Sequence, residues 1–563
     1  MFAVKSKTWT IVFILLIGTI AFGACAPRAA KQTQEAERQN EPVIVEVQPT
    51  RAVEVQKEVQ VVEKEVERQV RMTATPPPAA TPVPVVPVYG GETLPNDEPF
   101  DSMFFEHEGV NPFIDTEDDS LSTFAMDVDT ASYTIARRYV VEGHLPPPDA
   151  VRVEEFINYF DLAYPDPADG QGAFAIHLEG APSPFGGEHY SLLQIGIQGR
   201  RVHAEDRKDA VLIFVIDTSG SMKRENRLGM VQRALRMLVE ELRPTDKVGI
   251  VAYGSRAYVA LDPVRADQKR KILRAIDRLR AGGSTYAEEG LYEGYQMAYR
   301  AFEEEKINRV ILCSDGVANV GRTGADGILE TIADYAARGI TLSTVGFGMG
   351  NYNDVLMENL ADQGDGNYAY VDTLDEAERI FVDNLEGTLQ VIARDAKIQV
   401  DFNPEVISRY RLLGYENRDV ADEDFRNDDV DAGEVGAGHS VTALYEVKFH
   451  KDMAEGIERA LTVRVRYQDP DTGYVHEVAR EFWTDEFEGD WQHTSPAFLL
   501  TAAVAEYAEI LRDSYWAREG SLEDVLWLAR MAGDELEEDE VIGTDVSEFI
   551  WLVERAERLA RRG

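Results

Sequence analysis

The stretch VLIFVIDTSGS (residues 211–221) decides the fold of the central part of this 563-residue chain. Its first six residues are all apolar, as expected for a parallel strand that is buried on both faces. Asp217, Ser219 and Ser221 then follow at alternate positions, and Gly220 permits a tight turn between them. The sequence therefore predicts a buried strand that ends in a loop with oxygen-bearing side chains on one side.

Strand and helix patterns alternate after this stretch. Strands are expected at residues 248–253, 257–261, 309–313 and 340–346, and helices at residues 227–242, 268–280, 287–305, 328–337 and 374–392. Such alternation predicts an α/β fold over residues 209–392, with a doubly wound, mostly parallel sheet and helices on both faces. Ligands of such folds bind at the carboxyl ends of the strands.

Two further loops bring oxygen ligands to the same edge of the predicted sheet. GGST (residues 282–285) precedes a helix, and SDG (residues 314–316) directly follows a strand. Each loop alone could be a helix cap or an ordinary turn. The ordered set predicts a metal site, formed by Asp217, Ser219, Ser221, Thr285 and Asp315. Because all these ligands are hard oxygens, the site suits Mg²⁺, Mn²⁺ or Ca²⁺ and not zinc, which prefers His or Cys.

With these three loops, the region resembles a von Willebrand factor A domain with a metal-ion-dependent adhesion site of the pattern DxSxS…T…D. The resemblance implies that Ser219, Ser221 and Thr285 contact the metal directly, and that Asp217 and Asp315 act largely through water. It also implies that an Asp or Glu carboxylate of a protein partner completes the coordination. Mostly neutral direct ligands leave a cation under-neutralised, which agrees with that role. We therefore expect metal-dependent protein binding, in adhesion or as an envelope scaffold, rather than catalysis.

Segments on both sides of this domain resemble the bacterial YfbK-type family of A-domain proteins. They are NPF (111–113), DVDTASY (127–133), LPPPDAVR (145–152), EEFINYF (154–160) and GYENR (414–418). The resemblance supports an N-terminal associated region at residues 96–205, with helices near 132–142 and 151–160 followed by strands within 173–200.

Strands are also expected after the A domain, within a β region at residues 396–485. The ends of an A domain lie close together, so such a domain can be inserted into another one. We therefore predict that the strands at 173–200 and 397–483 form one β-sandwich around the inserted domain. Residues 490–563 have three helical patterns and predict a small helical region.

The N-terminus resembles a bacterial lipoprotein signal peptide (residues 1–24). Lys5 and Lys7 precede a nearly apolar stretch, and small residues then lead to Cys25, which would carry the lipid. The alternative is an uncleaved membrane anchor, since the apolar stretch is just long enough to span. Residues 25–95 are rich in Val, Glu and Lys and then in Pro, which predicts a disordered, extended tether. Both interpretations place the folded part on the extracytoplasmic side of a bacterial membrane.

Composition limits the partners of this chain. Lys and Arg number 57 against 101 Asp and Glu, which gives a net charge of −44. Such a field repels nucleic acid, so we expect no nucleic-acid partner. With two cysteines, Cys25 and Cys313, no disulfide framework is expected, and Cys313 lies in an apolar run as a buried thiol would.

Two other motifs remain as alternatives. DVDT (127–130) matches the DxDxT pattern of Mg²⁺-dependent phosphohydrolases of the haloacid dehalogenase type, in which Asp127 would be the nucleophile beside Asp129. That pattern needs a buried strand before it, and residues 122–126 predict a poor one. The family resemblance instead places Thr130 or Ser132 as a helix cap. The Asp-rich residues 422–434 could hold Ca²⁺, but their irregular spacing favours a solvated loop.

Overall fold

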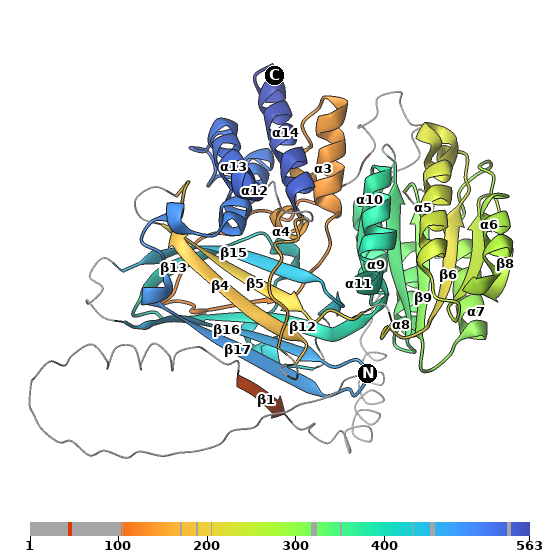
Figure 1. The fold of residues 1–563 in the computed structure, drawn as a ribbon, viewed down its shortest axis with the longest axis horizontal. Helices are drawn as coiled ribbons and strands as arrows, with labels where there is room; N and C mark the ends of the chain where they lie inside the picture. Colours follow the sequence, from red (N-terminus) through yellow and green to blue (C-terminus); the bar gives the residue numbers. More distant parts are fainter. Residues whose placement is uncertain are drawn as a thin grey trace, which may run out of the picture. The chain divides into compact units, whose positions relative to one another are not determined.

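The computed structural model describes most of the chain after residue 103 (Figure 1). The described residues are 43–47, 103, 105–168, 170, 172–186, 190–203, 205–316, 324–348, 352–428, 430, 432–450, 457–536 and 542–562. The predicted signal peptide with Cys25, and the predicted tether apart from residues 43–47, lie outside these ranges. Residues 43–47 form a strand that pairs with residues 475–479, so the expectation of disorder is wrong for this segment. No helix within them is both long and apolar enough to cross a membrane.

A doubly wound, mostly parallel sheet forms the centre of the inserted domain, with strand order β11-β10-β9-β6-β7-β8. Its strands are β6 (Ala210–Asp217), β7 (Lys247–Tyr253), β8 (Ala257–Arg265), β9 (Ile307–Ser314), β10 (Ile340–Phe347) and β11 (Tyr368–Val371). All neighbours are parallel except β7 and β8, which form an antiparallel edge. Every residue of β6 is buried, as its apolar run predicts. The predicted fold class is thus confirmed.

Helices cover both faces of this sheet (Figure 1). They are α5 (Arg227–Glu241), α6 (Lys269–Ile276), α7 (Ala287–Ala301), α8 (Gly324–Ala336), α9 (Asp354–Asp362), α10 (Leu374–Glu378) and α11 (Leu385–Leu389). One apolar core joins the sheet to α5, α6, α10 and α11, and a second joins it to α7, α8 and α9. The sequence did not predict α9 or β11.

The predicted continuous helix at residues 374–392 is wrong. The chain forms α10, a π-helical turn (Arg379–Asp383) and α11, and strand β12 begins at Val391. Val391 and Ile392 extended the apolar pattern of the helix, but both belong to β12. Short apolar runs fit a helix and a buried strand equally well. Here pairing with the neighbouring strand β14 (Gly433–Gly436) decides the outcome.

Strands from both sides of the inserted domain form a two-sheet sandwich. One sheet has the order β1-β17-β16-β12-β14, with β3 also on β12, and the other has the order β2-β13-β15-β5-β4. The strands are β1 (Val43–Val47), β2 (Ile114–Asp115), β3 (Leu121–Ala125), β4 (Phe174–Pro182), β5 (Ser191–Gly199), β12 (Val391–Phe402), β13 (Ile407–Leu413), β14 (Gly433–Gly436), β15 (Ser440–Phe449), β16 (Arg459–Gln468) and β17 (Val475–Trp483). Because β5 pairs with β15 and both sheets share one core, the predicted insertion into a β-sandwich is confirmed.

Strand β3 corrects one expectation, since residues 122–126 were predicted to be a poor strand. Their hydroxyls are bonded in the sandwich: Tyr445 donates to Ser122 over 2.9 Å, and Thr123 donates to Asp422 over 2.6 Å. These bonds, together with pairing to β12, allow a strand that contains Ser122 and Thr123 to lie in the sandwich.

Five further helices form a separate apolar core beside the sandwich. They are α3 (Ala131–Glu142), α4 (Val153–Asn158), α12 (Pro496–Leu511), α13 (Leu522–Leu536) and α14 (Gly543–Ala560). This confirms the helical patterns of both terminal regions. Helix α3 lies between α14 and the inserted domain (Figure 1), and its Ile135 and Tyr139 belong to the core of that domain. The predicted cap is wrong, because Thr130 makes no capping bond and Ser132 donates to the Ala150 carbonyl.

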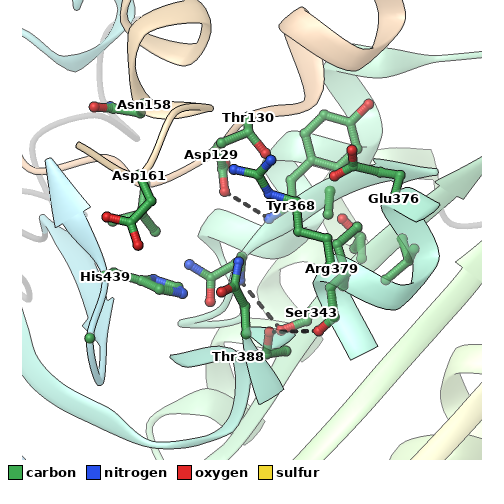
Figure 2. A pocket seen from close by; sticks show the side chains of 18 of the residues that line it. Asp129, Thr130, Asn158, Asp161, Ser343, Tyr368, Glu376, Arg379, Thr388 and His439 are labelled. Carbon is green, nitrogen blue, oxygen red and sulfur yellow. Dashed lines mark hydrogen bonds between the residues drawn. The ribbon is translucent and has the colours of Figure 1, made fainter. Parts of the chain in front are cut away.

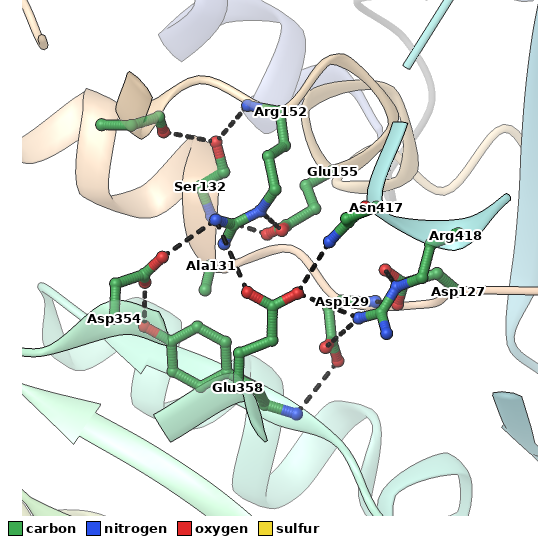
Figure 3. A network of polar contacts seen from close by, with 12 residues as sticks. Asp127, Asp129, Ala131, Ser132, Arg152, Glu155, Asp354, Glu358, Asn417 and Arg418 are labelled. Carbon is green, nitrogen blue, oxygen red and sulfur yellow. Dashed lines mark hydrogen bonds and ion pairs between the residues drawn. The ribbon is translucent and has the colours of Figure 1, made fainter. Parts of the chain in front are cut away.

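A buried polar network joins the inserted domain to the rest of the fold (Figure 3). Arg418, in the loop after β13, donates to Asp127 over 2.9 Å and to Glu358 of α9 over 3.1 Å. Arg152, just before α4, donates to Asp354 of α9 over 2.9 Å. Breaking such a buried pair leaves an uncompensated charge in the interior. The network therefore fixes α9 against the sandwich and the N-terminal region.

We predict that Arg418→Ala lowers the free energy of unfolding by about 3 kcal/mol or more, because Asp127, Glu358 and Asp362 lose a shared counter-ion. Arg426→Ala removes a guanidinium whose side chain is 59% exposed and should cost about 0.5 kcal/mol or less. Urea unfolding of the two variants measures the difference. Equal losses would contradict a stabilising role for the network.

Candidate metal and ligand site

The loop after β6 folds around the carboxylate of Asp217, the last residue of that strand. The Ser219 amide donates to Asp217 Oδ1 over 2.7 Å, and the Ser314 hydroxyl donates to Oδ2 over 3.2 Å. Ser314 is the last residue of β9, which lies parallel to β6. The sheet therefore fixes this carboxylate from two strands at once.

The serine hydroxyls of the same loop connect the surroundings of Asp217 to Asp315 through hydrogen bonds. Ser219 Oγ and Ser221 Oγ lie 2.8 Å apart, and Ser221 donates to Asp315 Oδ1 over 3.1 Å. Asp315 directly follows β9. These contacts bring Asp217, Ser219, Ser221 and Asp315, which the sequence placed in two separate loops, into one cluster of hard oxygen atoms.

The loop that carries Thr285 lies against the first loop through backbone bonds. Gly220 donates its amide to the Gly283 carbonyl over 2.9 Å, and Gly282 donates to the Thr218 carbonyl over 2.7 Å. Gly283 has φ +96°, a left-handed conformation that favours glycine. Thr285 is half-buried, and within the described residues it makes no hydrogen bond to the other four predicted ligands.

Two carboxylates of this cluster are buried, with exposed fractions of 0% for Asp217 and 3% for Asp315. Burial, and then the charge of Asp315, raise the pKa of Asp217 to about 7. Burial also raises the pKa of Asp315, although Arg227 opposes that shift. A buried carboxylate such as Asp217, which forms no ion pair within the described residues, is suited to a divalent cation. The donor set of this cluster therefore fits Mg²⁺, Mn²⁺ or Ca²⁺.

Hydroxyl oxygens would have to supply part of that coordination. Across the described part of the chain, no three His, Cys, Asp or Glu side chains gather as a metal-ligand group. The cluster at the ends of β6 and β9 has two carboxylates and, with Thr285, three hydroxyl-bearing ligands. That composition suits a cation with few charged ligands, such as Mg²⁺, which keeps several waters.

The sequence reasoning missed Arg227, which it described merely as the start of a helix. Its guanidinium Nη1 donates to Asp315 Oδ2 over 2.9 Å, and both side chains are almost completely buried. An arginine in the first turn of a helix is disfavoured by the helix dipole. That unfavourable position was the available signal that Arg227 has a specific carboxylate partner.

The carboxylates of the DxDxT pattern lie elsewhere, at the junction between the inserted domain and the sandwich. Asp127 pairs with Arg418, and Asp129 Oδ1 accepts the Tyr368 amide over 3.0 Å. The strand before them, β3, is only partly buried, whereas the pattern needs a buried strand. Both carboxylates thus have interaction partners within the junction between the inserted domain and the sandwich.

The remaining sequence candidates have simple environments. In the Asp-rich segment, Asp422 is half-buried and accepts the Thr123 hydroxyl, and Asp428 is exposed and pairs with Arg466 over 2.5 Å. Cys313 is a free, fully buried thiol, as predicted.

A cavity of about 130 Å³ lies at the same junction (Figure 2). Figure 2 shows Asp129 and His439 on one side, and Ser343 and Arg379 of the inserted domain on the other. Burial lowers the pKa of His439 to about 4, so its imidazole is neutral near pH 7. Ser343 accepts a bond from Arg309 over 3.1 Å. Since Ser343 and Asp129 are already bonded within the protein, we interpret this cavity as a packing space between domains.

Comparison with protein families finds three matches along the chain. Residues 99–194 match the family described as von Willebrand factor, residues 212–383 match von Willebrand factor type A domain, and residues 387–559 match Uncharacterized protein YfbK, C-terminal. Uncharacterized protein YfbK of Escherichia coli (strain K12) is 36% identical over 472 residues, which cover 79% of this chain and 80% of that protein. Uncharacterized protein sll0103 of Synechocystis is 25% identical over 50% of this chain and 67% of that protein.

Among solved structures, the chain is similar to von Willebrand factor type A from Catenulispora acidiphila. The two have a TM-score of 0.41 and 15% identity, over 65% of this chain and 88% of that one. The ArnB paralog VWA2 from Sulfolobus acidocaldarius has a TM-score of 0.33 and 15% identity, over 69% of this chain and 98% of that one.

We predict that Asp217→Asn changes the pH dependence of stability in EDTA. The folded-state pKa of about 7 lies above the unfolded value of about 4, so folding favours the protonated carboxyl. Wild-type stability should therefore fall between pH 4 and pH 8 relative to the variant, by on the order of 4 kcal/mol, because the shift spans about three pKa units. Urea unfolding across this range measures it. Parallel profiles would contradict the burial of an ionisable charge at Asp217.

Proposed function

We propose that this chain, which belongs to the YfbK family of proteins with a von Willebrand factor A domain, binds protein partners through a divalent cation. The observation that carries the proposal is the continuous line of contacts from Asp217 through Ser219 and Ser221 to Asp315. It lies at the carboxyl edge of a parallel sheet, where ligands of such folds bind.

Each predicted residue has a role in this proposal. The hydroxyl oxygens of Ser219, Ser221 and Thr285 would hold the cation, and the carboxylates of Asp217 and Asp315 would orient its water ligands. When bound, the cation supplies a focused positive charge that attracts a carboxylate from a partner. Because Asp217 and Asp315 are fixed by several hydrogen bonds, the chain itself pre-organises the oxygen atoms for binding.

We further propose that the protein acts at the cell envelope, as an adhesion protein or as a scaffold for an envelope complex. The support is the sequence before the folded part: basic residues, an apolar stretch and small residues that lead to Cys25. A lipid on Cys25 would anchor the chain, with residues 25–95 as a tether.

Thr285→Ala tests the metal-dependent function, because it removes a proposed ligand from a loop that keeps its backbone bonds. We expect Mg²⁺ binding, measured by calorimetry, to weaken by about tenfold or more. We also expect loss of any envelope protein that the wild type captures with Mg²⁺ and releases with EDTA.

Ser284→Ala is the matched control, since its hydroxyl bonds to Ser255 over 3.2 Å and is not a proposed ligand. It should keep both metal binding and capture. Capture that is indifferent to EDTA and to Thr285→Ala would overturn the proposed function.

Cys25→Ala tests the anchor. If the thiol is lipidated, labelled palmitate should enter the wild-type chain in a bacterial host, and the variant should take up none. Equal labelling of both would contradict lipidation at this position, and labelling of neither would favour an uncleaved anchor.

A further inference from the structure

The two carboxylate oxygens of Asp315 have different hydrogen-bond partners, Arg227 and Ser221. The Arg227 guanidinium bonds to Oδ2 over 2.9 Å, while Oδ1 accepts the Ser221 hydroxyl over 3.1 Å. The exposed fractions of the Arg227 and Asp315 side chains are 4% and 3%. A buried positive charge therefore lies immediately behind the oxygen cluster.

The surroundings hold this guanidinium in place. A Cβ atom added at Gly348, which has φ +86°, would lie 2.1 Å from Arg227 Nε, so this glycine leaves room for the side chain. Glu225 Oε2 lies 3.8 Å from Arg227 Nη2 and 3.6 Å from Nη2 of Arg138 on α3. Loops of the inserted domain thus surround Arg227, and helix α3 interacts with it through Glu225.

The charge of Arg227 changes what an occupied site can attract. The carboxylates of Asp217 and Asp315 together would neutralise a divalent cation. The Glu225 carboxylate is 43% exposed, so solvent screens its charge. With the buried guanidinium included, the occupied site therefore keeps about one net positive charge. At these separations, and behind low-dielectric walls, one unit charge alters ionic affinities by an order of magnitude or more. Arg227 therefore disfavours the cation and favours a negatively charged ligand on it.

We propose that Arg227 is the residue that makes this site select an anionic carboxylate, by keeping the metal-loaded site positively charged while weakening its affinity for the metal. This inference rests on the proposed metal-dependent function. It assigns Arg227 a positioning and electrostatic role, and not that of a metal ligand. A purely structural arginine would lower both affinities on removal, so the two roles predict opposite effects on metal binding.

Arg227→Gln in the full chain tests this proposal with two probes, Mn²⁺ alone and acetate. Calorimetry should show that the variant binds Mn²⁺ about tenfold more tightly than the wild type. Water-proton relaxation of the Mn²⁺-loaded proteins should show that acetate displaces bound water about tenfold less readily from the variant. Arg227→Lys, which keeps the charge, should retain wild-type values for both probes.

Arg207→Gln controls for the loss of a buried ion pair. Arg207 pairs with Asp246 over 2.8 Å. Asp246 directly precedes β7, so this pair lies at the amino ends of the parallel strands, opposite the candidate site. This variant should lose stability without altering either affinity. If Arg227→Gln binds Mn²⁺ no more tightly than the wild type, or keeps the wild-type acetate affinity, the role of Arg227 is overturned while the proposed metal-dependent function stands. If the wild type binds no Mn²⁺, the proposed function fails as well.

Discussion

The pairing of buried carboxylates with arginines is the constraint on which the rest of this structure depends. Arg137 pairs with Asp372 over 2.6 Å, and Arg152 and Arg418 pair with carboxylates of α9. All three arginines come from outside the inserted domain, while these partners lie on it. A buried charge without a counter-ion is strongly destabilising, so these pairs require the domain and its surroundings to fold together.

The inserted domain is consequently not an independent unit. Helix α3 places Ile135 and Tyr139 in its apolar core, although α3 belongs to the N-terminal region. The same helix carries Arg138, whose guanidinium lies 3.6 Å from the Glu225 carboxylate near the candidate site. The surroundings of the site therefore include a part of the fold that A domains as such do not supply.

Ion pairing also distinguishes the junction from the candidate site. At the junction, Asp127, Glu358 and Asp362 each form an ion pair with Arg418, over 2.9, 3.1 and 3.0 Å. At the ends of β6 and β9, Arg227 reaches Asp315 while Asp217 is held by hydrogen bonds from Ser219 and Ser314. The site therefore differs from the junction because Asp217 is buried among hydrogen-bond donors and forms no ion pair within the described residues, and for this reason a cation suits it.

The sequence by itself determined the features that depend on neighbouring residues. The apolar run before Asp217 specified a buried strand, and the alternating strand and helix patterns specified the sheet, because burial follows local periodicity. Where the pattern fitted both a helix and a strand, or predicted only a poor strand, the tertiary structure decided the secondary structure. Val391 in β12 and the residues of β3 form strands because they pair with segments far away in the chain. The tertiary structure also decided the pairing of Arg227 with Asp315, 88 residues apart, because a contact between distant side chains leaves no periodic trace in the sequence.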